Sequence, residues 1–123
     1  MNIANENCET FLSIITENQT NLIRVERLAE LISTVLGIKN NPIIKKYKKI
    51  ENSYKLEFTF PLDSLKNSII ESLEKTDRLC SPWSVRFNHD KTDIELIFNK
   101  SESITYGRNE FNVITWANWE IDN

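Results

Sequence analysis

The residue best placed to do acid-base chemistry is the single histidine, His89, which is followed by Asp90. A neighbouring carboxylate can orient an imidazole and raise its pKa, so this pair could act as a general acid and base. Residues 89–91 also separate two runs of alternating apolar residues, as a hairpin turn does, and turns favour polar residues. We favour the turn interpretation, and keep a small enzyme that uses His89 and nearby carboxylates as an alternative.

Other residues with chemical potential are sparse. The two cysteines, Cys8 and Cys80, lie far apart, so they form neither a zinc-ligand pattern nor a disulfide framework, and buried thiols are expected. The only glycines are Gly37 and Gly107, too few to line a phosphate-binding loop. The sequence therefore predicts no catalytic residue, no cofactor and no metal.

A cluster of cations lies in residues 39–57, which contain six lysines and two acids. Lys45, Lys46, Lys48 and Lys49 surround Tyr47 and could contact nucleic-acid phosphates while the ring stacks on a base. Residues 90–123 have the opposite balance, with seven acids and three bases, and the whole chain has a net charge of -3. Because nothing extends the basic stripe, we expect a solvated lysine surface and no direct binding of nucleic acid.

Four segments have apolar residues at helical spacing, namely residues 5–17, 20–36, 43–50 and 63–78. The first two predict a helical hairpin. Thr20 is the expected cap of its second helix, and Gly37 is positioned to end that helix. The predicted buried stripe of the last helix includes Ile69, Ile70 and Leu73.

Four further segments, at about 54–60, 83–87, 94–98 and 111–121, alternate apolar and polar residues, as strands with one buried face do. The predicted fold class is α+β: an N-terminal helical hairpin followed by a β-α-β-β-β unit that forms a four-stranded, mainly antiparallel sheet packed on helices. With 123 residues and 40% hydrophobic content, the chain fits a single domain over residues 1–123.

The alternation also assigns side chains to the two faces of the predicted sheet. The face opposite the core has an apolar centre and an acidic rim, which is typical of a protein interface. Arg86 lies on this face but is not among the residues predicted to bind a partner. Those residues are Asp93, Glu95, Ile97, Ile114, Trp116 and Glu120. Two alternatives stay open. The helical hairpin could cover this face, or a local bulge could exchange the roles of Trp116 and Trp119.

These features resemble those of the small, acidic, cytoplasmic immunity proteins of bacterial contact-dependent inhibition and related polymorphic toxin systems. The resemblance rests on the size, the acidity, the 15 Asn and 16 Ile residues, the helix-plus-sheet layout and the acidic segment Trp116–Asp122. It implies a non-catalytic protein that binds and neutralises a cognate toxin domain, often a basic nuclease. Besides the small enzyme, a further alternative is a phage- or plasmid-encoded inhibitor of a host nucleic-acid enzyme.

The N-terminal segment has acids at Glu6 and Glu9 and no basic region of the kind that begins a secretory signal. No apolar run approaches the roughly 20 residues that a membrane-spanning helix needs. We therefore expect a cytoplasmic protein that makes no membrane contact. The sequence leaves its oligomeric state open.

Overall fold

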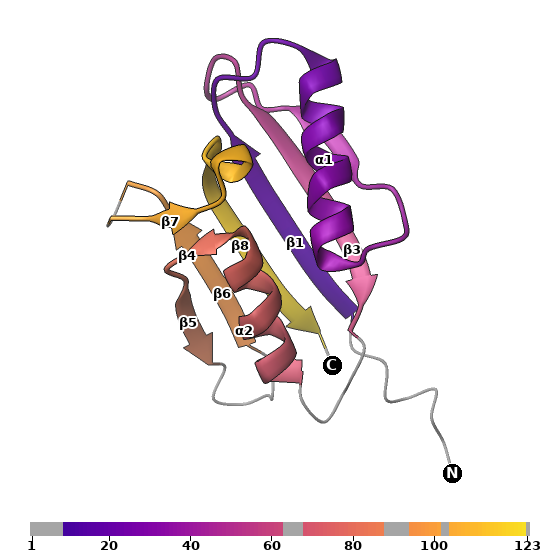
Figure 1. The fold of residues 1–123 in the computed structure, drawn as a ribbon, viewed down its shortest axis with the longest axis vertical. Coiled ribbons are helices and arrows are strands. Elements are labelled where there is room, and N and C mark those ends of the chain that lie inside the picture. The colour runs from indigo at the N-terminus through magenta and orange to yellow at the C-terminus, as the bar shows by residue number, and fades with distance from the viewer. Residues whose placement is uncertain (1–8, 63–67, 88–93, 102–103, 123) are drawn as a thin grey trace.

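The computed structural model describes residues 9–62, 68–87, 94–101 and 104–122. Their elements, drawn in Figure 1, are β1 (Glu9–Thr16), α1 (Leu22–Leu36), β2 (Ile43–Lys46), β3 (Tyr54–Pro61), α2 (Ser68–Leu79), β4 (Cys80–Ser81), β5 (Ser84–Phe87), β6 (Ile94–Asn99), β7 (Tyr106–Gly107), the 3-10 helix η2 (Asn109–Phe111) and β8 (Ile114–Asp122). Six strands form one antiparallel sheet in the order β2-β3-β1-β8-β6-β5, and β4 pairs with β7 in a second, two-stranded sheet.

The segment predicted as the first helix is instead β1, a central strand, so the predicted helical hairpin is wrong. β1 pairs with β3 on one side and with β8 on the other. Its buried residues alternate along the strand and are Thr10, Leu12, Ile14 and Thr16. A short apolar run can fit both the helical and the strand period, and here the β-branched residues and the two partner strands decide for the strand.

The short helix predicted over residues 43–50 is also wrong, because residues 43–46 form the edge strand β2. β1 and β2 are both antiparallel to β3, so they run parallel to each other with β3 between them. α1 connects them, which makes a split β-α-β arrangement. β1 and β2 thus add to the four predicted strands, and the four-stranded sheet of the prediction is corrected to a six-stranded one.

The ends of α1 follow local chemistry. The side chain of Asn21 accepts a hydrogen bond from the backbone N–H of Ile23 at 2.7 Å, so Asn21 and not Thr20 is the N-cap. Gly37 ends the helix, as predicted, with a left-handed φ of 73°. The backbone N–H groups of Gly37 and Ile38 donate to carbonyl groups of the last turn, which otherwise would lack partners.

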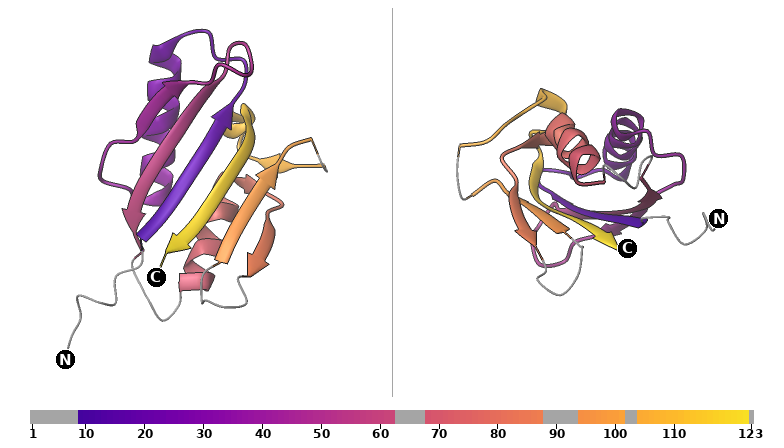
Figure 2. Two further views of the ribbon diagram at one scale, coloured as in Figure 1. Left: turned by 180° about the vertical axis from the view of Figure 1, so that it is seen from behind. Right: turned by 90° about the horizontal axis from the view of Figure 1, so that it is seen from below.

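Both helices pack on the same face of the six-stranded sheet, as the two views in Figure 2 show. The core lies between this face and the helices, and Phe60 and Trp119 meet there edge to face with their ring centroids 5.4 Å apart. Other fully buried core residues are Leu12, Ile14, Val25, Ile32, Leu36, Leu56, Leu96 and Ala117. Neither helix packs on the other face of the sheet (Figure 2).

α2 packs on its neighbours through its polar side, contrary to the predicted stripe. Ile69, Ile70 and Leu73 are 40%, 56% and 44% exposed. The buried residues of the helix are Ser72, Lys75, Thr76 and Leu79. The Lys75 ammonium donates to the carbonyl of Leu36 at 2.9 Å, at the C-terminal end of α1. Apolar spacing therefore predicted the existence of this helix but not the side on which it is buried.

Candidate functional site: the open face of the sheet

The sheet face opposite the helices has no helix over it in the described part of the chain (Figure 2). Because successive strand residues point to opposite faces, the side chains on this side are those that alternate with the buried ones. We call this surface the open face and define it by these residues: Glu9, Phe11, Ser13, Ile15, Ile43, Lys45, Lys55, Glu57, Thr59, Pro61, Ser84, Arg86, Glu95, Ile97, Asn99, Trp116, Asn118 and Glu120.

Four apolar side chains lie on the three inner strands β1, β8 and β6 of the open face. Trp116 on β8 pairs with Ile15 on β1, and Ile97 on β6 lies one row further along the sheet. Phe11, two rows from Ile15 on β1, is 41% exposed, and the other three side chains are partly exposed. Paired side chains on one face lie roughly 4.5 to 5.5 Å apart at Cβ, so Ile15 and Trp116 lie side by side. Ile97 is paired with Asn118 and Phe11 with Glu120, so the four apolar side chains are spread over three rows of the sheet, among polar ones.

The two tryptophans of β8 lie on opposite faces. Trp119 is 0% exposed and belongs to the core, whereas Trp116 belongs to the open face. A bulge is present, but it falls before both: Ile15 pairs with Trp116 while Thr16 pairs with Ile114. The extra residue turns the side chain of Ile114 to the helix side, where it is 1% exposed. The bulge therefore changes the position of Ile114 and leaves both tryptophans where the alternation assigned them.

Of the residues predicted to bind a partner, the structure brings Glu95, Ile97, Trp116 and Glu120 together on the open face. Arg86 lies beside them, because it pairs with Glu95 across β5 and β6. Ile114 does not lie on this face, because the bulge turns its side chain to the helix side. Asp93, together with His89 and Asp90, lies outside the described residues.

Sequence reasoning missed the contribution of β1, which supplies Phe11, Ser13 and Ile15 from the middle of the sheet. The helical spacing of residues 5–17 predicts a helix there and so assigns these residues to no sheet face. The signal that could have found them is the alternation of Thr10, Leu12, Ile14 and Thr16, which has a strand period and ends in a β-branched residue.

One end of the open face is acidic. Glu95 on β6 and Glu120 on β8 are directly paired, and Glu9 lies nearby at the start of β1. The side-chain amide of Asn118 donates to the Glu95 carboxylate at 2.5 Å, which orients that group. Like charges directly opposite one another on a sheet face are destabilising. Arg86 on β5 is paired with Glu95, yet the acids outnumber this cation at this end, so the end is suited to a basic surface.

The other end carries cations from the β2 and β3 side of the sheet. Lys45 and Lys55 are paired there, and the Lys45 ammonium lies 3.0 Å from a carboxylate oxygen of Glu57. Lys46, Lys48 and Lys49 are exposed, consistent with the expected solvated surface, although the first of them lies on a strand and not on a helix. The charge of the open face is thus polarised along its length.

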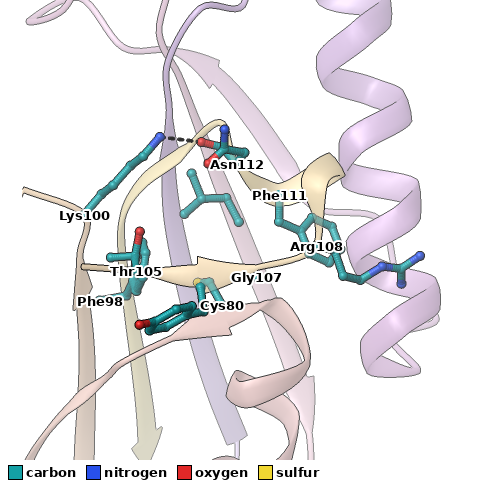
Figure 3. Close-up of a pocket in the computed structure, with 10 residues that line it drawn as sticks. Cys80, Phe98, Lys100, Thr105, Gly107, Arg108, Phe111 and Asn112 are labelled. Carbon is teal, nitrogen blue, oxygen red and sulfur yellow. Dashed lines mark hydrogen bonds between the residues drawn. The ribbon is translucent and has the colours of Figure 1, made fainter. Parts of the chain in front are cut away.

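A separate pocket of ≈ 270 Å³ lies beside β4 and β7, and its lining residues are drawn in Figure 3. The Lys100 ammonium at its edge is already engaged, because it pairs with the Glu17 carboxylate at 2.9 Å and donates to the carbonyl of Asn112 at 2.6 Å. Burial raises the pKa of the Cys80 thiol to about 12. Since the thiolate is the nucleophile, Cys80 is inert at neutral pH, and the pocket does not form an activated nucleophilic site.

The described residues contain no cluster of three or more His, Cys, Asp or Glu side chains able to hold a metal ion. None of the helices in this part of the chain has the length and apolar character needed to cross a membrane. The chain matches no protein-family model, no curated protein and no solved structure.

Proposed function

We propose that this protein is a non-catalytic immunity protein that neutralises a cognate toxin domain by binding a basic surface of that domain through the open face. The observation that carries the proposal is the open face itself, a sheet surface over which the described residues place no helix. It presents Trp116, Ile97, Ile15 and Phe11 among charged residues, which are acidic toward Glu95 and Glu120 and basic toward Lys45 and Lys55.

Two properties of this face support a protein partner. Tryptophan is enriched among the residues that contribute most to binding, and Trp116 is directly paired with Ile15 on the open face. Its neighbours are partly exposed, so burying them under a partner would remove apolar surface from water. The strands below are hydrogen-bonded on both sides, which holds these side chains in a rigid arrangement before binding.

The acidic end supports a basic partner. Glu95 and Glu120 lie opposite each other, so together they attract an Arg or Lys of the partner. A nuclease is a suitable class of toxin, because its substrate-binding surface must be basic to hold phosphates. A protein that covers that surface with acids would exclude the substrate.

The test starts with a partner captured from the native cell by the full-length chain and purified as a toxin domain. Trp116→Ala is expected to weaken the purified complex by at least about 2 kcal/mol and to abolish protection of growing cells against that toxin. Ile97→Asp should act in the same way. Val85→Asp is the matched control, because Val85 is on the neighbouring strand and is also partly exposed, but faces the helix side.

Other outcomes separate the alternatives. If the captured partner is a host nucleic-acid enzyme that Trp116→Ala releases, the protein is a phage- or plasmid-encoded inhibitor and the immunity proposal is wrong. If no partner is lost on Trp116→Ala and His89→Ala abolishes a measurable reaction, the small-enzyme alternative replaces it. The proposal includes a cytoplasmic location, which is supported by the free thiol of Cys80.

A further inference from the structure

A second recognition surface lies at the opposite side of the molecule from β5, where a groove of ≈ 610 Å³ runs between α1 and the edge strand β2. One wall is a face of α1, with Ala29 and Ser33 at its centre. The other wall is formed by Pro42 and Ile44 at the start of β2. Ala29 and Ser33 have small side chains, so space remains between the helix and the strand.

The backbone of β2 determines what kind of ligand fits this groove. The N–H of Tyr47 donates to the carbonyl of Ser53 at 2.9 Å, directly after the last rung of the β2–β3 ladder. Hydrogen-bonded pairs alternate along an antiparallel ladder, so Lys45 and Ile43 also bond inward to β3. The N–H and C=O groups of Ile44 and Lys46 therefore point away from β3, at the edge of the sheet, and Ile44 also lines the groove. Only an extended chain matches this spacing of donors and acceptors.

The charges of the groove determine which extended chain fits best. Glu26 and Glu30 line the α1 wall at i and i+4, and within the described part of the chain they form no ion pair. Like charges at this spacing destabilise a helix, and a cation between them would reverse that effect. Lys39 lies at the other end of the groove, where the loop after α1 closes it.

We infer that β2 and α1 bind an extended peptide segment that adds a strand to the edge of the sheet and directs a basic side chain at Glu26 and Glu30. This site is independent of the open face and of the function proposed for it. A residue opposite Ile44 in the added strand points to the same side as Ile44, toward the helix. That residue is the basic one, with its aliphatic stem along Ile44 and its charge at the two carboxylates.

A second copy of this chain is the less suitable occupant of the edge. Twofold antiparallel pairing through Ile44 and Lys46 would place Lys45 directly opposite Lys45 of the other copy. Like charges in that position are unfavourable, and lysines on edge strands oppose pairing between identical sheets.

The experiment titrates the ¹⁵N-labelled full chain with the end-blocked peptide Thr-Val-Lys-Val-Thr, which can place its central lysine opposite Ile44 in either chain direction. The amide signals of Ile44 and Lys46 should shift, together with those of Ala29 and Ser33. The peptide Thr-Val-Glu-Val-Thr should bind about tenfold more weakly, since attraction to two carboxylates becomes repulsion. The double substitution Glu26→Gln and Glu30→Gln should remove this difference between the peptides.

A pair of variants tests the backbone contact. Lys46→Pro removes one outward N–H but no bond to β3, so it should abolish binding without unfolding the protein, whereas Lys46→Gln keeps the N–H and should bind. The inference is overturned if the Lys peptide shifts none of these signals, if both peptides bind equally, or if Lys46→Pro binds while folded. It is also overturned if the signals of β2 change with protein concentration alone, which would show a dimer at this edge. Trp116→Ala should leave the titration unchanged, so failure here and failure of the proposed toxin binding are separate results.

Discussion

The two tryptophans of β8 show how a side chain's environment determines the effect of replacing it. Trp119 is fully buried against Phe60, so Trp119→Ala is expected to lower the free energy of unfolding by about 3–5 kcal/mol. Trp116 is partly exposed on the open face, and Trp116→Ala should cost far less stability. Chemical denaturation of both variants measures the difference. Equal losses would mean that Trp116 is also a core residue and would remove it as a binding anchor.

The buried thiol of Cys80 is expected to make the stability of the protein depend on pH. Burial raises the pKa of its thiol from 9.0 to about 12 in the folded protein, so the folded state disfavours the thiolate. The contribution of this group to stability is complete below pH 9.0 and is lost as the pH rises toward 12. The stability difference between the wild type and Cys80→Ala should therefore shrink across that range, as followed by urea denaturation at several pH values.

The same residue can be tested chemically at neutral pH. In a Cys8→Ser background, Cys80 should react with iodoacetamide only after the protein is unfolded, because the folded thiol is both buried and protonated. Rapid alkylation of the native protein would contradict this burial and would restore Cys80 as a nucleophile candidate.

At the scale of elements, α2 stabilises α1 by supplying cations to its C-terminal end. Lys75 donates to the carbonyl of Leu36 at 2.9 Å and lies 3.4 Å from the carboxylate of Glu71. Lys75→Met keeps the length of the side chain but leaves that carbonyl and carboxylate without their cation. We expect a loss of about 1–3 kcal/mol in the free energy of unfolding, measured by denaturation.

Arg78 is the control for this prediction. It also reaches the end of α1, but its contact with the carbonyl of Val35 is long, at 3.4 Å, and exposed. Arg78→Met should change stability by no more than about 0.5 kcal/mol. If both variants lose the same stability, the buried position of Lys75 is not what makes its contact effective.

At the scale of the whole molecule, the polarised open face predicts how the protein meets a basic partner. Reversing Glu95 and Glu120 to Lys should slow association and weaken its dependence on salt, because exposed charges act mainly on encounter. Dissociation should change less. Stopped-flow or surface-based kinetics at several ionic strengths measure both rates. An unchanged association rate would show that the acidic end does not face the partner.

Several features could be predicted from local sequence, since each depends on residues close together in the chain. Gly37 ends α1 because only a residue that tolerates positive φ allows the chain to turn there. The alternation in residues 54–60 and 94–98 predicted β3 and β6, and that of residues 116–121 assigned Trp116 and Trp119 to their faces. In each case the local pattern and the tertiary packing favour the same structure.

Other features were decided only by the tertiary structure. The apolar residues of 9–16 suit a helix or a strand, and the choice came from pairing with β3 and β8, which are distant in sequence. α2 has an apolar stripe, yet its polar side is buried because Lys75 meets the end of α1. Because the segment of the predicted first helix is the strand β1, the predicted helical hairpin does not form and cannot cover the open face. The bulge next to Ile15 turns Ile114 to the helix side. The physical reason is common to all three: burial and hydrogen bonding depend on which segments meet, and local spacing carries no information about distant partners.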